Sequence, residues 1–146
     1  MSLLSFVKEA GEKLLDLLTP GNDNASEQLK EHISKVGLGN PNVQATVDGD
    51  KVTVTGEVAS QEEKEKILLA VGNIAGVGSV DDQITVTGPV VTAAQFVVVK
   101  SGDTLSAISL RVYGDANKYQ KIFDANKPML KDVNKIYPGQ TLRIPE

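Results

Sequence analysis

Residues 96–145 read FVVVKSGDTLSAISLRVYGDANKYQKIFDANKPMLKDVNKIYPGQTLRIP, and this stretch decides the fold of the C-terminal part of the chain. Its apolar start predicts a strand that enters a Ser-Gly-Asp-Thr turn at residues 101–104. Two short helices follow, and a Tyr-Pro-Gly-Gln turn at residues 137–140 leads into a closing strand. This order of elements, βααβ, predicts a small α+β unit.

This stretch resembles the LysM module. LysM modules usually bind N-acetylglucosamine polymers such as peptidoglycan, so the resemblance implies a glycan groove between two loops. The candidate groove residues are Gly102, Asp103 and Thr104 in the first loop and Asn126 and Lys127 after the second helix. A purely structural interpretation stays open, because a Gly-Asp-Thr sequence also makes a turn and caps a helix.

Length and composition set the outer limits of the prediction. A chain of 146 residues with 40% hydrophobic content suits two modules of modest size, each with its own core. It contains no cysteine and a single histidine, His32. A disulfide framework, a thiol nucleophile, a cysteine-based metal site and a histidine-rich metal site are therefore excluded. The absence of cysteine also fits a reducing compartment.

The charge pattern argues against two classes of partner. The net charge is −4, and the basic residues are neither dense nor interleaved with aromatic ones, so we expect no nucleic-acid surface. No stretch approaches the roughly 20 apolar residues of a membrane span. No basic segment precedes the short apolar run at residues 3–7, which argues against a secretory signal. We therefore expect a cytoplasmic protein, and a monomer.

Residues 1–24 are predicted to form an N-terminal helix and a linker. Leu3, Val7, Ala10 and Leu14 recur at helical spacing, and the polar segment TPGNDNA begins at Thr19. Three interpretations stay open for this segment. It is an amphipathic helix docked on the next domain, a helix on a membrane surface, or a segment whose main chain around Gly11 serves a ligand.

Residues 25–88 are predicted to form an αββαβ unit. Ser26 is a candidate cap for the first helix, and Asp48-Gly49-Asp50 predicts a hairpin turn between two alternating strands. Ser60 and Glu63 form a capping box that opens a second helix. A third strand is expected at residues 79–86.

The sequence VTVTGEVASQEEKEKILLAVGNIAGVGSVDDQITV resembles the BON domain, whose members are often assigned to phospholipid contact. The resemblance runs over residues 25–88. A joint at residues 89–95 then leads to the LysM-like module at residues 96–146. The fold class is therefore expected to be α+β.

The order of the three parts along the chain also resembles that of a known family. A segment containing FVKEAGEKL, one BON-like domain containing KEKILLAVGNIAGV, and a LysM-like module containing KSGDTLSAIS resemble the bacterial cytoplasmic potassium-binding proteins of BON–LysM architecture. The resemblance implies a K⁺-binding protein or sensor that changes conformation when the ion binds, and not an enzyme. The alternative is a peptidoglycan-binding or N-acetylglucosamine-binding adaptor that acts through the LysM module.

Main-chain carbonyl oxygens are the ligands that K⁺ channels use, and such a cage leaves only glycines and small residues as its trace in a sequence. Two glycine-bearing bends exist, at residues 7–12 and 71–78. The ligands that the resemblance implies, each through its carbonyl oxygen, are Val7, Ala10, Gly72, Ile74 and Val77, with Glu12 as a weaker sixth. Without the resemblance, GNIAGVG is simply a turn between a helix and a strand.

Catalysis finds little support in the sequence. Glu62, Glu63 and Glu65 alternate with lysines and are interpreted as a solvated helix face. Asp81 and Asp82 are neighbours in a strand, so their side chains point to opposite faces. The serines lack a histidine partner, because His32 is expected on a surface helix of the other domain. We expect a protein that is not an enzyme.

Overall fold

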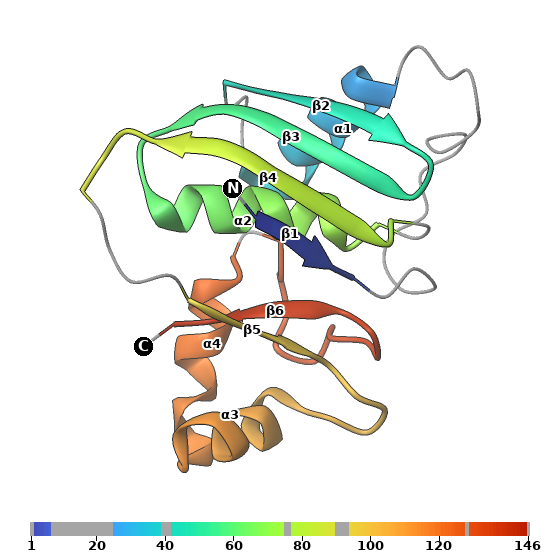
Figure 1. Ribbon diagram of the computed structural model, residues 1–146. Coiled ribbons are helices and arrows are strands. Elements are labelled where there is room, and N and C mark those ends of the chain that lie inside the picture. The colour runs from blue at the N-terminus through green and yellow to red at the C-terminus, as the bar shows by residue number, and fades with distance from the viewer. Residues whose placement is uncertain are drawn as a thin grey trace.

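The computed structural model describes residues 2–6, 25–38, 42–74, 77–89, 94–127 and 129–145. These residues form two domains with separate hydrophobic cores (Figure 1). The α+β class and the αββαβ and βααβ orders of elements are confirmed.

A four-stranded sheet forms the N-terminal domain, with helices on one of its faces (Figure 1). Its strand order is β1-β4-β3-β2; β3 and β4 are parallel, and the other neighbours are antiparallel. Its elements are β1 (Ser2–Ser5), α1 (Ala25–Ile33), the π-helical turn η1 (Ser34–Leu38), β2 (Val43–Asp48), β3 (Lys51–Val58), α2 (Gln61–Gly72) and β4 (Ser79–Val86). Helix α2 is the crossover between the parallel pair and lies along the sheet.

Local sequence explains these elements. Gly49 takes a positive φ of 63° in the two-residue turn between β2 and β3, a conformation that glycine adopts without steric cost. Ser60 caps α2 by accepting a hydrogen bond from the main-chain N–H of Glu63 at 3.1 Å. The hydrophobic face of α2 then packs on the sheet through Ile67, Leu68 and Val71.

The C-terminal domain pairs two strands beside two helices. Its elements are β5 (Gln95–Val98), α3 (Leu105–Tyr113), the 3₁₀ turn η2 (Ala116–Lys118), α4 (Tyr119–Ala125) and β6 (Thr141–Ile144). Strands β5 and β6 are antiparallel. Thr104 caps α3, and Gly114 closes it with a positive φ of 74°.

One local prediction is wrong. Residues 2–5 form strand β1 on the open edge of β4, although Leu3 was expected to begin a helix. Leu4 and Phe6, two residues apart, both pack against the core, so the period of two belongs to a strand. The rest of the expected helix lies outside the described residues. Helix α1 begins at Ala25, one residue before Ser26, the predicted cap.

The C-terminal domain docks on helix α2. Strand β6 lies against this helix, which therefore contacts its own sheet on one side and the other domain on the opposite side (Figure 1). None of the helices in the described ranges is both long enough and apolar enough to span a membrane.

Candidate ion site and domain interface

Phe6 anchors the N-terminal segment at the end of α2. Its main-chain N–H donates a hydrogen bond of 2.9 Å to the carbonyl oxygen of Gly78. Its ring lies directly over Gly72, so closely that a Cβ added to this glycine would overlap the ring carbons. A single residue thus contacts both ends of the bend at residues 72–78, and the chain enters Val7 immediately after it.

The bend presents main-chain oxygens at the C-terminal end of a helix. Helix α2 ends at Gly72, so the carbonyls of its last four residues have no partner within the helix. The Leu69 carbonyl accepts a hydrogen bond of 2.9 Å from the N–H of Asn73. The helix dipole places partial negative charge at this end, which favours a cation.

Three of the six predicted ligands lie together in this bend. Gly72, Ile74 and Val77 are all buried, and the Val77 N–H donates a hydrogen bond of 3.1 Å to the Ile74 carbonyl. Val7, Ala10 and Glu12 lie outside the described residues. Within the described ranges, no group of three or more histidine, aspartate or glutamate side chains is placed to hold a metal ion. Gly72, Ile74 and Val77 have no side-chain oxygen, so each can offer a cation only its main-chain carbonyl.

Asn73, between Gly72 and Ile74, connects the bend to the C-terminal domain. Its Nδ2 donates to the carbonyl oxygen of Thr141 at 2.8 Å, and its Oδ1 accepts from the Thr141 N–H at 2.8 Å. A weaker contact of 3.6 Å joins Nδ2 to the Sδ of Met129. Sequence reasoning missed this residue, because an asparagine beside a glycine is also what an ordinary turn contains.

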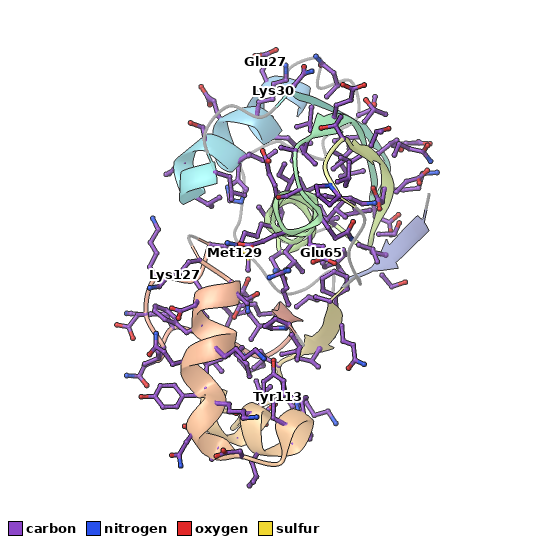
Figure 2. All side chains as sticks on the ribbon, turned by 90° about the vertical axis from the view of Figure 1, so that its left-hand side faces the viewer. Glu27, Lys30, Glu65, Tyr113, Lys127 and Met129 are labelled. Atoms are coloured by element: carbon purple, nitrogen blue, oxygen red, sulfur yellow. The ribbon has the colours of Figure 1, made fainter. Side chains whose placement is uncertain are left out.

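A buried ion pair forms the second link between the domains. Glu65 on α2 is only 2% exposed, and its Oε1 accepts a hydrogen bond of 2.8 Å from the Nε of Arg143. Its Oε2 accepts from the Ala94 N–H at 2.9 Å and from the Nε2 of Gln61 at 3.1 Å. Figure 2 shows Glu65 at the junction of the two domains.

The prediction that Glu65 belongs to a solvated face is therefore wrong, and the physical reason is the docked domain that covers it. By contrast, Glu62, which lies one turn before Glu65 on α2, is exposed. A hydrogen bond from Lys66 lowers the pKa of Glu62, and the positive charges of Lys66 and Arg143 act in the same direction.

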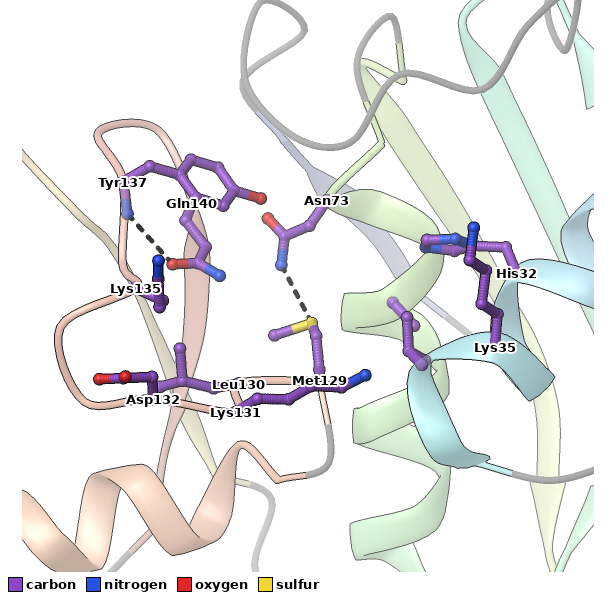
Figure 3. Close-up of a pocket in the computed structure, with 12 residues that line it drawn as sticks. His32, Lys35, Asn73, Met129, Leu130, Lys131, Asp132, Lys135, Tyr137 and Gln140 are labelled. Carbon is purple, nitrogen blue, oxygen red and sulfur yellow. Dashed lines mark hydrogen bonds between the residues drawn. The ribbon is translucent and has the colours of Figure 1, made fainter.

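A cleft lies between the two domains beside Asn73 (Figure 3). Its volume is about 570 Å³, and its walls come from α1, η1 and α2 on one side and residues 129–140 on the other. His32 lines the cleft and is buried, so its expected place on a solvent-facing surface is wrong. The cleft is lined by His32, Lys35, Val36, Ala70, Asn73, Met129, Leu130, Lys131, Asp132, Lys135, Tyr137 and Gln140.

The first-loop glycan candidates have structural roles. Gly102 takes a positive φ of 84° in the turn. Asp103 accepts a hydrogen bond from the Lys100 N–H at 3.0 Å, and Thr104 accepts one from the Ala107 N–H at 3.1 Å. These contacts form the turn and the helix cap, as the structural interpretation expected.

The second-loop candidates also have partners within the domain. The Asn126 amide is buried and donates to the carbonyls of Ile122 and Arg143, at 2.8 and 2.9 Å, while its Oδ1 accepts from the Arg143 N–H at 2.8 Å. The Nζ of Lys127 lies 4.6 Å from the centre of the Phe123 ring and 3.3 Å from Asp124. Glycan binding stays a prediction for this module.

Comparison with known proteins agrees with this two-domain arrangement. Residues 22–88 match the BON domain family, and residues 97–145 match the LysM domain family. The chain is 57% identical over 149 aligned positions to the "Potassium binding protein Kbp" of Escherichia coli O6:H1 (strain CFT073), covering 100% of this chain and 99% of that protein. It is also 36% identical over 67 residues to the "Uncharacterized protein YqbP" of Bacillus subtilis (strain 168), covering 40% of this chain and 31% of that protein.

Proposed function

This chain belongs to the BON–LysM family of the potassium binding protein Kbp, and we propose that it binds K⁺ through main-chain carbonyl oxygens between its N-terminal segment and the bend at residues 72–78. The proposed ligands are Val7, Ala10 and Glu12 from the first segment and Gly72, Ile74 and Val77 from the second.

The position of Phe6 carries this proposal. Its contacts with Gly72 and Gly78 bring the N-terminal segment to the bend, although more than 60 residues separate them in the chain. Val7 follows Phe6 directly in the chain, and consecutive Cα atoms are about 3.8 Å apart. We propose that carbonyl oxygens from the two segments meet around one ion at this bend.

The chemistry of the bend suits a large monovalent ion. A cage of carbonyl oxygens replaces the hydration shell of K⁺ without placing a formal charge in the protein interior. The C-terminal end of α2 adds partial negative charge to the cage. Because the ligands are main-chain atoms, Val77 has to provide only its backbone and a buried aliphatic side chain.

We also propose that ion binding changes the way in which the domains dock. Asn73 lies between two of the proposed ligands and holds Thr141 of β6 with its side chain. An ion that fixes the carbonyls of Gly72 and Ile74 also fixes the backbone of Asn73. Linkage then requires that docking of the LysM domain strengthens ion binding by the same factor.

The glycan-binding alternative is less favoured. The side-chain amide of Asn126 donates its hydrogen bonds within the LysM domain, and the hydroxyl of Thr104 caps a helix. We further propose that the protein is a monomeric ion-binding protein without catalytic activity and that it acts in the cytoplasm. The cysteine-free composition fits that compartment.

Calorimetric titration with KCl, NaCl and a chitin oligomer tests the proposal, with choline chloride holding the ionic strength constant. We expect heat from K⁺, much less from Na⁺ and none from the oligomer. The same samples should melt at a higher temperature in K⁺, since a ligand at 100 times its Kd adds about 2.7 kcal/mol to the stability. Equal effects of K⁺ and Na⁺ would reduce the observation to a general salt effect and contradict the proposal.

A further inference from the structure

We propose that the cleft between the domains is a second ligand site, which binds a small organic oxyanion: a carboxylate or phosphate group on a body with an apolar side. The cleft has a volume of about 570 Å³. Small-molecule sites typically have volumes of roughly 300–1,000 Å³. This site takes an anion and lies beside the proposed cation site, so it is separate from the proposed function.

The charges around the cleft are opposite in sign to those of the chain. Lys35, Lys131 and Lys135 line it, with Asp132 as the single acidic residue on its walls, while the whole chain has a net charge of −4. In the described part of the chain, none of these three lysines forms an ion pair. Their ammonium groups are therefore available to an incoming anion.

The side-chain amide of Gln140 adds a hydrogen-bond donor to the wall of the cleft. Gln140 is 4% exposed, and its Oε1 accepts a hydrogen bond of 3.4 Å from the Tyr137 N–H. Its Nε2 donates to no acceptor among the residues that the structure describes. Figure 3 shows this amide turned across the cleft toward Asn73 and Met129. This N–H donor on the wall of the cleft is therefore open to a hydrogen bond from it to the oxygen of a bound anion.

The remaining wall is apolar and indicates what the anionic group is attached to. Val36 and Ala70 on one side and Met129 and Leu130 on the other are buried or half-buried. Methionine adapts to irregular ligand shapes because its side chain is unbranched and polarizable. A ligand that fills the cleft therefore places its oxyanion at the lysines and Gln140 and its apolar side on these residues.

Both domains contribute to the cleft. Lys35 belongs to η1 of the BON domain, whereas Lys131 and Lys135 belong to the LysM domain. An anion held between them adds attraction across the domain interface, so it binds the docked arrangement more tightly than any other.

The test is an NMR titration of the full-length ¹⁵N-labelled protein with two matched pairs of probes. AMP and adenosine differ in the phosphate, and succinate and succinamide differ in the carboxylates. We expect AMP or succinate to shift the Gln140 side-chain amide signal and the main-chain signals of residues 129–140, and we expect their uncharged analogues to leave them in place. Binding of AMP would identify the anionic group as a phosphate, and binding of succinate would identify it as a carboxylate.

Two triple variants with the same change of charge locate the site. Lys35→Gln/Lys131→Gln/Lys135→Gln should weaken binding of the acid at least about tenfold, since hydrogen bonds to charged groups are the stronger ones. Lys100→Gln/Lys118→Gln/Lys121→Gln removes three exposed lysines elsewhere on the LysM domain and should leave binding unchanged. Equal losses in the two variants, equal shifts with the uncharged probes, or no shift with either acid would each overturn the proposal.

Discussion

The side-chain amide of Asn73 pairs with the main chain of Thr141 in the way that a neighbouring strand would. Donor and acceptor distances are both 2.8 Å, and the two residues come from different domains. Asn126 makes the equivalent pair with Arg143 from within the LysM domain, at 2.9 and 2.8 Å. Because Thr141 and Arg143 are two residues apart on β6, their polar groups point to the same edge of the strand.

Replacing Asn73 by alanine should weaken K⁺ binding roughly tenfold, within the usual range of coupling between sites. Both hydrogen bonds to Thr141 disappear, so the carbonyls of Gly72 and Ile74 lose their link to the LysM domain. Calorimetric titration with K⁺ measures the change. Gln83→Ala is the control, because it removes a hydrogen bond of similar length, 2.9 Å to Asp81, within the BON domain.

Hydrogen exchange separates this coupling from a general loss of stability. In the unaltered protein, K⁺ should slow hydrogen exchange of the Thr141 N–H, which donates to the Oδ1 of Asn73. It should have little effect on the Arg143 N–H, which donates to the Oδ1 of Asn126. Asn73→Ala should abolish the K⁺ dependence at Thr141. If Asn73→Ala bound K⁺ as tightly as the unaltered protein, the proposed coupling between ion binding and docking would be contradicted. The proposal of K⁺ binding itself would stand.

Gly72→Ala should destabilise the bend by about 1–3 kcal/mol, the usual cost of overpacking, and should weaken K⁺ binding as well. The new methyl group would occupy the position of the Phe6 ring. Phe6→Leu in the same chain makes room for it and should restore part of both losses. Thermal unfolding with and without K⁺ measures the two effects. If Gly72→Ala caused the same loss whether or not Phe6→Leu was also present, the mechanism would be contradicted.

Arg143→Met should cost about 3–5 kcal/mol, because it leaves the Glu65 carboxylate buried without its partner. Replacing Glu65 by methionine as well should recover most of this loss. Arg111→Met provides a matched comparison, since its pair with Asp103 is exposed and 3.5 Å long. That variant should change the stability by no more than about 1 kcal/mol. Urea unfolding of the unaltered protein, Arg143→Met, Glu65→Met/Arg143→Met and Arg111→Met tests the prediction. Equal losses of unfolding free energy in the two single arginine variants would contradict it.

The pair of Glu62 and Lys66 predicts a small dependence of stability on pH. Lys66 lowers the pKa of Glu62 below its ordinary value of 4.5, so the pair stabilises the fold above that pH. The contribution is lost as the pH falls through the lowered pKa of the folded protein. Lys66→Gln should therefore cost up to about 0.5 kcal/mol at neutral pH and nothing in acid, since exposed pairs of this kind are weak. A stability difference that does not shrink between neutral and acid pH would contradict this assignment.

Local signals predicted the fold well. The turn at Asp48-Gly49-Asp50, the cap at Ser60 and the strand Ser79–Val86 lie where the sequence placed them. Each depends on a few neighbouring residues, through a turn conformation, a capping hydroxyl or an alternating pattern. Strand β1 was missed because Leu3 and Val7 happen to be spaced as in a helix.

The domain interface could not be predicted, because its partners are distant in the chain. Glu65 alternates with lysines as a solvated residue does, and its partner Arg143 lies 78 positions later. Asn73 and Thr141 are separated by 68 positions. Nothing in the residues around either one indicates that a second domain covers it. The candidate ion ligands likewise came from a family resemblance, since carbonyl oxygens leave no side-chain pattern.

The asparagine pair also has a consequence for self-association. Strand β6 is bonded to β5 on one side, and the amides of Asn73 and Asn126 occupy its other side. If the LysM domain moved away from the BON domain, the N–H and C=O of Thr141 would become an uncovered strand edge, which can add a strand from another molecule. Docking therefore covers this part of the strand edge, and we expect intermolecular β-structure under conditions that separate the two domains.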